Sequence, residues 1–476
     1  MLEENICLLT DSYKVCHHYF YPEGTEKLYS YLESRSGAIY NKTVFYGLQY
    51  ILKKYLEGKV VTEKKIDEAE KVICKHIGEN VFNRKGWEYI LDEHDGYLPL
   101  EIKAVPEGIP VDVGNVLMTV VNTDNESFWL PNYLEPLLLQ VWYPSTVATL
   151  SAEIRKLLNF YLHLTADDDS NLDFMLHDFG FRGASSVESS RLGGSAHLLS
   201  FKGTDTLSSL SIPVNYYNYP DIVGFSVQAT EHSVMTSMGE DDEFKQVCSV
   251  IENANNGVLS LVIDSYNYRN FLKNCTKGRI YDKINEFLDK SEDNKIVFRP
   301  DSGEPVSTTL DCLDILSEGF DTYYNSKGYE VFDLNIGLLW GDGLDYQKIR
   351  DILFSLKNNN WSVENIIFGM GGGLHTNVNR DTQRNAFKCS AQYRNGEWID
   401  ISKNPLDSSK KSKTGRFQLV RENTGHFRTI SLHGNFKLAI SSEKDFLKPV
   451  FKDGMICSEI SFEDIRGNIK EYWRNL

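Results

Sequence analysis

The sequence lacks the long apolar run that a membrane-spanning helix requires. Crossing a bilayer takes roughly 20 apolar residues, and the most apolar candidate, residues 134–142, is interrupted by Glu135, Pro136 and Gln140. The N-terminus, Met1-Leu-Glu-Glu-Asn5, is acidic where a signal peptide is basic. We therefore expect a cytoplasmic protein that does not associate with membranes.

Paired cysteines are absent as well. The eight cysteines are scattered and include no Cys-x-x-Cys pair, so their spacing supports neither a zinc site nor a disulfide framework. The sequence also contains no Ser-His-Asp order, no P-loop and no Gly-x-Gly-x-x-Gly motif. These absences leave little support for a zinc enzyme or a hydrolase.

An excess of positive charge is missing too, since the net charge is −17 at pH 7. This charge argues against general binding to nucleic acids or to anionic membranes. A phosphate-binding site in such a chain has to hold a local positive pocket against the field of the whole protein. Arginine at the end of a buried strand is therefore more informative here than in a basic chain.

One pattern does recur between Leu176 and Leu374: a short apolar run that ends abruptly in Gly, Asp or Arg. Its occurrences are Leu176-His-Asp-Phe-Gly-Phe-Arg182, Leu259-Ser-Leu-Val-Ile-Asp264, Lys295-Ile-Val-Phe-Arg-Pro-Asp-Ser-Gly303, Gly337-Leu-Leu-Trp-Gly-Asp-Gly343 and Asn365-Ile-Ile-Phe-Gly-Met-Gly-Gly-Gly373. Buried parallel strands read as continuous apolar runs, and the loops after their C-terminal ends carry the chemistry of α/β barrels. Most of the spacings, roughly 20–40 residues, leave room for one crossover helix.

The pattern therefore predicts an active-site rim at one face of an α/β barrel, suited to an anionic substrate such as a phosphorylated one. Besides a glycine cluster, that rim would carry Arg182, Asp264, Arg299, Asp301 and Asp342.

The chain of 476 residues is long enough for a large barrel and an accessory domain. We expect residues 1–160 to form the N-terminal part of a mixed α/β accessory domain. Residues 161–379 would form the α/β-barrel catalytic domain, and residues 380–476 would return to the accessory domain. Within these segments, apolar spacing predicts helices over 44–56, 66–77 and 145–162 and short strands over 99–122. The acidic runs 167–169 and 240–243 are expected to be solvated loops.

Each candidate residue also has a plain structural interpretation. Arg299 and Asp301, fixed by Pro300 between them, suit a substrate site, but they also suit a structural ion pair that caps the barrel. Asp342, between two glycines, suits ribose hydroxyls, a metal ion or a simple turn. His232 suits a general base, a phosphate acceptor or a hydrogen-bonded structural histidine. The glycines at 369–373 suit a phosphate cradle or a tight turn.

Taken together, longer motifs resemble the nicotinamide phosphoribosyltransferases, of the type II phosphoribosyltransferase family. They are Asp11-Ser-Tyr-Lys14, Val44-Phe-Tyr-Gly-Leu-Gln-Tyr50, His177-Asp-Phe-Gly-Phe-Arg-Gly183, Phe201-Lys-Gly-Thr-Asp-Thr206, Glu231-His-Ser233, Arg299-Pro-Asp-Ser-Gly303, Gly341-Asp-Gly343 and Gly371-Gly-Gly373. The resemblance runs in order from about residue 5 to the last twenty residues. It implies an irregular α/β barrel in a homodimer whose sites lie at the subunit interface.

The resemblance also implies roles for individual residues. Phe179 and Tyr13, the latter from the partner subunit, would sandwich the pyridine ring of nicotinamide, and Asp205 would accept from its carboxamide. Arg299 would bind near the ring and the phosphate. The remaining contacts to phosphoribosyl pyrophosphate would come from Arg182 and His232 at the pyrophosphate, from Asp301, Gly341 and Asp342 on the ribose and phosphate side, and from Gly372 at the 5′-phosphate. A basic set associated with phosphate access matches Arg35, Arg380, Lys388, Lys403 and Lys410.

The resemblance further implies Mg²⁺ as cofactor and ATP as a coupled substrate that phosphorylates His232 transiently. It leaves the metal ligands unidentified. Two departures bear on the transfer of roles. The stretch 35–43 is short compared with some relatives, and Ala386 stands where a serine is familiar.

Two other functions are compatible with this fold. One is a nicotinate-specific relative, against which Asp205 argues, because a carboxylate facing the carboxylate of nicotinate would cost about 4 kcal/mol at about 4 Å and an effective dielectric constant near 20. The other is a catalytically dead binding or signalling protein. The presence of Asp205, His232, Arg299 and Asp301 speaks against that alternative.

Overall fold

The five apolar runs of the sequence form parallel strands of one sheet. These strands are β6 (Leu176–Asp178), β9 (Val258–Val262), β10 (Lys295–Arg299), β13 (Ile336–Trp340) and β14 (Ile366–Met370). Two-residue strands, β7 (Gly203–Thr204) and β8 (Gln228–Ala229), lie at the edges and complete the order β7-β6-β14-β13-β10-β9-β8. Every pairing in this sheet is parallel. The predicted parallel sheet is confirmed.

The two edges of the sheet are bridged by one short segment, residues 225–229. Phe225 forms a parallel bridge with Gly203 of β7, and three residues later β8 pairs with Leu259 and Ser260 of β9. The curled sheet therefore forms an irregular barrel in which a single bridge replaces a full strand pair. This agrees with the predicted fold class.

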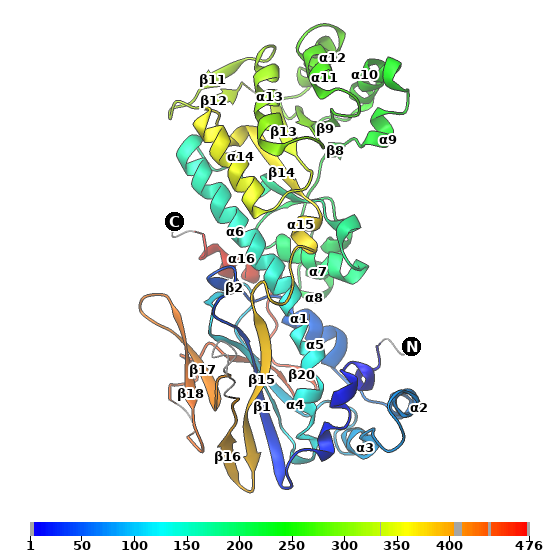
Figure 1. Cartoon of the computed structure of the whole chain (residues 1–476), viewed down its shortest axis with the longest axis vertical. Helices are drawn as coiled ribbons and strands as arrows, with labels where there is room; N and C mark the ends of the chain where they lie inside the picture. Colours follow the sequence, from blue (N-terminus) through cyan, green and yellow to red (C-terminus); the bar gives the residue numbers. More distant parts are fainter. Residues whose placement is uncertain (1–3, 334, 404–411, 437–438, 474–476) are drawn as a thin grey trace. The chain divides into compact units, whose positions relative to one another are not determined.

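Helices cover the outside of this sheet, and Figure 1 shows α13 and α14 beside β13 and β14. The helices that follow or precede the strands are α6 (Trp142–Thr165), α7 (Val187–His197), α8 (Ser211–Tyr216), α9 (His232–Met235), α10 (Glu243–Asn253), α11 (Tyr268–Thr276), α12 (Arg279–Leu288), α13 (Pro305–Ser317), α14 (Tyr346–Asn358) and α15 (Gly372–His375). With helices outside, strands such as β13 are buried at all five positions, which explains their continuous apolar sequence. A small hairpin, β11 (Thr322–Tyr324) and β12 (Glu330–Phe332), is added beside α13.

The computed structural model describes residues 4–333, 335–403, 412–436 and 439–473. It divides the chain into two compact units. The barrel unit comprises residues 150–211, 221–377 and 473–476, and the accessory unit comprises residues 1–149, 212–220 and 378–472. The short excursion 212–220 into the accessory unit has no counterpart in the sequence analysis. No helix in the described part of the chain is long and apolar enough to span a membrane.

The accessory unit is built on a second sheet, in the order β16-β15-β1-β5-β3-β19-β20. Its strands are β1 (Thr25–Ser34), β3 (Leu100–Ala104), β5 (Val116–Asn122), β15 (Asn385–Arg394), β16 (Glu397–Asp400), β19 (Lys448–Lys452) and β20 (Met455–Ile456). All of these pairings are antiparallel, and the longest joins β1 to β15 over ten-residue strands. N-terminal and C-terminal segments of the chain therefore share one sheet.

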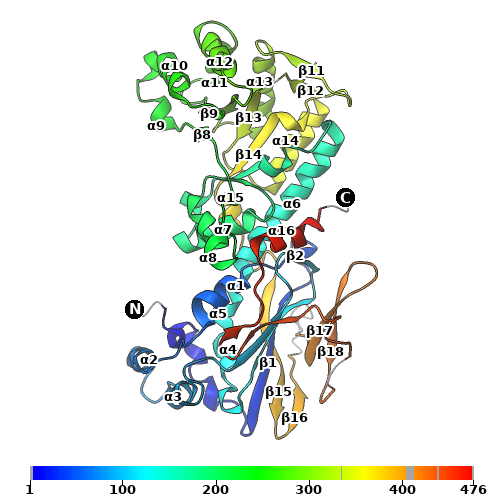
Figure 2. The same ribbon diagram turned by 180° about the vertical axis from the view of Figure 1, so that it is seen from behind.

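Two small antiparallel pairs and several helices complete this unit, as Figure 2 shows from behind. The pairs are β2 (Lys42–Val44) with β4 (Pro110–Asp112), and β17 (Arg416–Arg421) with β18 (Phe427–Leu432). The helices are α1 (Leu48–Ile51), α2 (Glu63–His76), α3 (Arg84–Glu93), α4 (Leu130–Tyr133), α5 (Glu135–Leu139), α16 (Phe462–Lys470) and the start of α6.

Two local predictions need correction. The helix expected over 44–56 begins only at Leu48, because Gly47 has a φ of 101° and turns the chain after β2, and its second half, Leu52–Leu56, is a π-helix. The acidic run 240–243 is not solvated throughout. Residues 240–242 are exposed, but Glu243 is only 5 % exposed at the start of α10, where burial raises the pKa of its carboxyl group.

Candidate active site

The C-terminal ends of the barrel strands carry most of the predicted site residues. Phe179 and Arg182 follow β6, Asp205 follows β7, His232 begins α9 after β8, and Asp264 lies two residues after β9. Asp301, Gly341 and Gly372 follow β10, β13 and β14, and Arg299 is the last residue of β10. Because these strands are parallel and adjacent, their C-terminal ends open on one rim of the barrel.

Arg299 and Phe179 form the centre of this rim. The guanidinium carbon of Arg299 lies 6.0 Å from the centroid of the Phe179 ring, and Arg299 Nη2 donates to the carbonyl of Thr230 at 3.3 Å. Arg299 Nε is 4.0 Å from Asp301 Oδ1 and is buried without a hydrogen-bond partner among the described residues. The long Arg299–Asp301 distance argues against a purely structural ion pair.

A cavity of about 340 Å³ continues from this rim into the barrel. Its end nearest the rim, here called its mouth, is lined by Phe179, Asp205 and Arg299 at the C-terminal ends of their strands, and His177 and Ser226 also line the cavity. The Asp205 carboxylate accepts a hydrogen bond from the Ser226 hydroxyl. Burial lowers the pKa of His177, against the opposite effect of Asp205, and this favours a neutral imidazole. The mouth therefore combines an aromatic face, a carboxylate and a cation, which suits a flat polar ring.

Lys295 also lines this cavity and was not among the predicted site residues. It begins β10, and the alternating residues Lys295, Val297 and Arg299 all face the cavity. Burial lowers the pKa of Lys295, although Glu364 acts in the opposite direction. The strand period of two residues was the signal that could have identified it.

His232 and Asp301 are joined through Asp264. His232 Nε2 lies 3.2 Å from Asp264 Oδ1, and Asp264 Oδ2 accepts from the backbone N–H of Asp301 at 3.0 Å and from the Ser302 hydroxyl. The Asp264 side chain is 3 % exposed, whereas that of His232 is 47 % exposed. Asp264 is thus the buried support of this part of the rim. Glu231 does not orient His232, because its carboxylate accepts from the Ser233 hydroxyl instead.

Glycines allow the rim segments to approach closely. A Cβ atom on Gly369 would lie 2.1 Å from the Phe179 ring, and one on Gly341 would lie 3.3 Å from Asp301 Oδ1. Gly372 begins α15, and its Cα is 3.1 Å from where a Cβ of Gly183 would be. The Arg182 loop therefore rests directly on the Gly372 turn. The side chains of Arg182 and Asp342 are exposed on the rim.

The other predicted residues belong to the accessory unit. The Tyr13 side chain is 61 % exposed beside the His17 ring, at a centroid distance of 5.4 Å. Burial lowers the pKa of Lys388, an effect that Arg35, Lys403 and Lys14 reinforce by charge repulsion and Glu135 opposes. The structure thus brings Arg35, Lys388 and Lys403 near one another. Arg380 Nη2 lies 3.7 Å from Asp381 Oδ1, and Lys410 lies outside the described residues.

Sequence analysis missed the acidic partner of this basic cluster. Glu33 is 2 % exposed, accepts from Arg35 Nε at 3.1 Å and from Lys413 Nζ at 2.6 Å, and pairs across the sheet with Ala386. Glu33 is in β1 and Arg35 follows directly after its last residue, and their i, i+2 spacing places both on one face of the extended chain. Glu33 therefore fixes Arg35 of the cluster and one further cation, Lys413.

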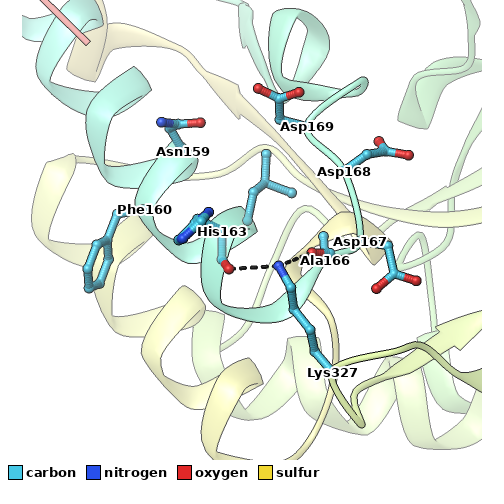
Figure 3. Close-up of a pocket in the computed structure, with 9 residues that line it drawn as sticks. Asn159, Phe160, His163, Ala166, Asp167, Asp168, Asp169 and Lys327 are labelled. Carbon is cyan, nitrogen blue, oxygen red and sulfur yellow. Dashed lines mark hydrogen bonds between the residues drawn. The ribbon is translucent and has the colours of Figure 1, made fainter. Parts of the chain in front are cut away.

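A second cavity of the barrel unit, shown in Figure 3, is separate from this rim. It lies at the end of α6, where Lys327 Nζ donates to the carbonyls of His163 and Ala166. The neighbouring aspartates 167–169 are exposed, as predicted. They do not converge on one point (Figure 3), and Asp168 accepts from Ser170 while Asp167 accepts from Ser326. Within the described part of the chain, no group of three His, Cys, Asp or Glu side chains could hold a metal ion.

Comparisons with known proteins agree with this geometry. The model of the nicotinate phosphoribosyltransferase family matches residues 174–454, and that of the N-terminal domain of nicotinamide phosphoribosyltransferase matches residues 5–102. In solved structures, the fold resembles nicotinate-nucleotide pyrophosphorylase from Pyrococcus furiosus, with a TM-score of 0.62 and 16 % identity over 100 % of this chain and 97 % of that one. It also resembles human nicotinic acid phosphoribosyltransferase, with a TM-score of 0.55 and 14 % identity over 98 % and 93 % of the two chains.

Two curated relatives are similar over nearly their whole length. The nicotinamide phosphoribosyltransferase of Xanthomonas campestris pv. campestris is 41 % identical over 470 residues, which are 98 % of each chain. That of Acinetobacter baylyi is 32 % identical over 493 aligned positions, covering 97 % of this chain and 96 % of the relative. The chain belongs to the nicotinamide phosphoribosyltransferase family of pentosyltransferases.

Proposed function

We propose that the protein transfers the phosphoribosyl group of 5-phosphoribosyl 1-pyrophosphate to nicotinamide, forming nicotinamide mononucleotide and pyrophosphate for NAD salvage. The observation that carries this proposal is the cavity mouth, where Phe179, Asp205 and Arg299 line one opening of the barrel. The relatives from Xanthomonas and Acinetobacter carry the same activity in their names.

The cavity mouth suits the pyridine ring of nicotinamide. The Phe179 ring offers a flat apolar face that holds a ring with little loss of side-chain entropy. Asp205 supplies an acceptor for the carboxamide N–H₂ group, and the same carboxylate would repel the carboxylate of nicotinate. The guanidinium of Arg299, which lies over the Phe179 ring and lines the same cavity, can donate to a substrate oxygen.

The rim suits displacement at the ribose. The ring nitrogen of nicotinamide would attack the anomeric carbon, and the bond from that carbon to pyrophosphate oxygen would break with its electron pair leaving on pyrophosphate. This step needs no protein nucleophile, so the chain contributes positioning and charge. Arg182 would face the pyrophosphate, and Asp301 and Asp342 would hold ribose hydroxyls.

The exposed rim carboxylates also fit a role for Mg²⁺. This ion usually takes one or two protein carboxylates and completes its shell with water and substrate phosphates, so the absence of a three-residue cluster among the described residues is compatible with it. Asp301, 35 % exposed, and the exposed Asp342 are the residues that would hold it. When bound, the ion would neutralise charge developing on pyrophosphate.

We further propose that ATP phosphorylates His232 and so favours product formation. The His232–Asp264 contact supports this, because an imidazole that donates from Nε2 to a carboxylate keeps its lone pair on Nδ1. That lone pair would attack the γ-phosphorus of ATP and release ADP, and hydrolysis of the phosphohistidine would release phosphate. In the expected result, the wild-type protein hydrolyses ATP and carries an acid-labile phosphate, and His232→Ala loses both. Persistence of ATP stimulation in that variant would place the coupling elsewhere.

A homodimer is the proposed assembly. The exposed Tyr13, which lies in the motif Asp11-Ser-Tyr-Lys14, supports it as an aromatic residue available to a second copy of the chain. In such a dimer, Tyr13 of one subunit would cover the face of the pyridine ring opposite Phe179 of the other.

The deciding experiment is a pair of parallel reactions. Purified protein is incubated with phosphoribosyl pyrophosphate, Mg²⁺ and either nicotinamide or nicotinate, and the mononucleotides are quantified by chromatography. We expect product from nicotinamide and little from nicotinate. Preferred turnover of nicotinate would favour the nicotinate-specific alternative, and no turnover of either would favour a binding protein of the same fold.

A further inference from the structure

A buried pair, Asp178 and His375, joins two segments of the rim. His375 Nε2 lies 2.8 Å from Asp178 Oδ1, and both side chains are 0 % exposed. Asp178 ends β6 and immediately precedes Phe179, whereas His375 ends α15, which begins at Gly372. One buried contact therefore links the loop that carries Phe179 to the turn that carries Gly372, across 197 residues of sequence.

Asp178 also holds the backbone around it. Its Oδ1 accepts from the N–H of Gly180 at 2.8 Å, and its carbonyl accepts from the N–H of Asp205 at 2.9 Å. The next residue, Phe179, donates its N–H to the carbonyl of Met370 at 3.0 Å. The strand ends that present Phe179 and Asp205 to the cavity are thus tied to the same residue.

His375 is in close steric contact with the neighbouring loop 179–183. A Cβ atom on Gly180 would lie 1.9 Å from His375 Cδ2, so the imidazole lies directly against the Gly180 backbone. Gly183, at the end of the same loop, is in similarly close contact with Gly372. Because densely packed groups cannot shift independently, displacement of His375 would displace the loop 179–183 relative to the turn 371–373.

The electrostatics of the pair make it sensitive to the loss of either partner. Burial on its own would raise the pKa of Asp178, but the hydrogen bond and charge of His375 outweigh it and hold that pKa below its usual value. The charge of His197 and the Gly180 N–H contribute in the same direction. Asp178 Oδ2 is buried with no hydrogen-bond partner among the described residues. The carboxylate therefore depends on His375, and removing the histidine would leave a buried charge without its main partner.

We propose that Asp178 and His375 are positioning residues that set the spacing between the ring-binding loop 179–183 and the phosphate-binding turn 371–373. The inference rests on the proposed function, since it places these segments at the two ends of one nucleotide. A nucleotide held at both ends is sensitive to their separation, and an error of about 1 Å in placement can reduce the rate about 100-fold.

The first test is kinetic and uses three variants of the full-length protein. His375→Leu should raise KM for nicotinamide and phosphoribosyl pyrophosphate and lower kcat/KM about 100-fold, with the fold retained by circular dichroism. In His375→Gln the side-chain amide can still donate to the Asp178 carboxylate and so keep the two segments linked. Its kcat/KM should therefore stay within about 10-fold of wild type. The control is His163→Gln, which replaces a histidine of the barrel unit at the exposed end of α6, outside both segments, and should keep wild-type kinetics.

A double variant separates the kinetic effect of misplaced loops from the loss of stability caused by an unpaired buried charge. Asp178→Asn combined with His375→Leu removes the carboxylate charge as well as the histidine, so its melting temperature should recover relative to His375→Leu alone. The kinetic defect should remain, because the link between the two segments is still broken. Recovery of both stability and kcat/KM would overturn the proposal, as would unchanged kinetics in His375→Leu.

The second test is independent of the reaction. Hydrogen–deuterium exchange of the free protein should show faster exchange in the loop 180–184 of His375→Leu, where Gly183 and Ala184 donate their N–H groups to Gly180, and no change in β9. If the wild type lacked transferase activity but the loop exchanged faster in His375→Leu, the proposed function would be wrong. The structural link between the loop and the turn would still be confirmed. Unchanged exchange in the loop would contradict the link itself.

Discussion

The buried carboxylate of Asp264 contacts the exposed imidazole of His232, with Asp264 Oδ1 3.2 Å from His232 Nε2. The other carboxylate oxygen accepts from the backbone N–H of Asp301 and from the Ser302 hydroxyl. One carboxylate, 3 % exposed, therefore orients the residue assigned to ATP and the loop assigned to ribose. Asp264 therefore positions its neighbours on the rim in addition to contributing a negative charge there.

Asp264→Asn should consequently impair both activities. An amide cannot accept with both of its polar atoms, so either the Asp301 N–H or the His232 N–H loses its acceptor. Hydrogen bonds to charged groups contribute about 1.5–3 kcal/mol, which corresponds to a reduction of about 10- to 100-fold in kcat/KM and to loss of most ATP stimulation. Steady-state assays with and without ATP measure both.

Ser302→Ala is the control for Asp264→Asn, because it removes a single partner of the same carboxylate and leaves its charge intact. We expect a reduction of less than about 5-fold, because the carboxylate keeps its charge and its contacts with the Asp301 N–H and with His232, so neither substrate-facing residue loses its partner. Wild-type activity and full ATP stimulation in Asp264→Asn would show that Asp264 serves the fold alone.

The sequence was most informative about the barrel core. Strands such as β13 are buried on both faces, so their apolar runs stand out, and each run ends where the chain reaches the rim. The edge strands β7 and β8 escaped detection because two residues, Gly203-Thr204 and Gln228-Ala229, are too short to form an apolar pattern. Their place in the sheet is set by pairing with neighbours, which local sequence does not encode.

Residues that act through distant partners could not be predicted in the same way. His375 follows the glycine cluster and reads locally as part of a turn, and only the fold brings it to Asp178. In the local sequence Glu33 looks like an ordinary strand residue. Its burial and its ion pair come from β15 and Lys413, which are distant in the sequence. Lys295 is different, since its alternation with Val297 and Arg299 was visible in the sequence and would have placed it on the same face of β10.

Asp205→Asn should relax the preference for nicotinamide over nicotinate. The carboxylate at the cavity mouth is held by the Ser226 hydroxyl, and its charge opposes a second carboxylate on the ring. Removing that charge lifts a repulsion of about 4 kcal/mol at about 4 Å and an effective dielectric constant near 20. The ratio of kcat/KM values for the two pyridines measures the effect. An unchanged ratio, or equal turnover of both by the wild type, would count against the assignment.

Tyr13→Ala and Arg299→Ala subunits should complement each other in a mixed dimer. Each variant alone would lack one component of both sites, because in the proposed dimer Tyr13 of one subunit completes the site that Arg299 of the other subunit lines. After subunit exchange, a mixed dimer would contain one site with both defects and one with neither. Activity should recover toward one intact site per mixed dimer. The control is exchange between two Tyr13→Ala preparations, and absence of recovery after verified exchange would refute shared sites.

Lys295→Met should stabilise the protein by about 1 kcal/mol at neutral pH, since it removes a charge that burial disfavours and keeps the length of an apolar side chain. The gain should shrink as the pH rises toward 10.5, the usual pKa, because the lysine then loses its charge in both folded and unfolded chains. Chemical denaturation at several pH values measures it. Lys290→Met, on an exposed position after α12, is the control, and a lower stability of Lys295→Met would indicate that Glu364 or a ligand compensates the charge.

His197 should make the barrel unit sensitive to acid. It is fully buried, with Nδ1 3.1 Å from the Ser151 hydroxyl and Nε2 3.2 Å from the carbonyl of Gly203, and burial lowers its pKa from 6.5 to about 4. Above pH 6.5 the histidine is neutral in both folded and unfolded chains, and the stability is fully present. As the pH falls from 6.5 to about 4, the unfolded chain binds a proton that the folded chain does not, so the free energy of unfolding decreases.

The loss should be on the order of 3 kcal/mol over this window, at about 1.4 kcal/mol for each pH unit. His197→Gln lacks the titrating group and should show a flatter decline between pH 6.5 and 4, even if its stability at neutral pH is lower. His163→Gln, at the exposed end of α6, should retain the wild-type slope. Urea denaturation across this pH range measures the slopes, and identical slopes for the wild type and His197→Gln would show that other groups govern acid unfolding.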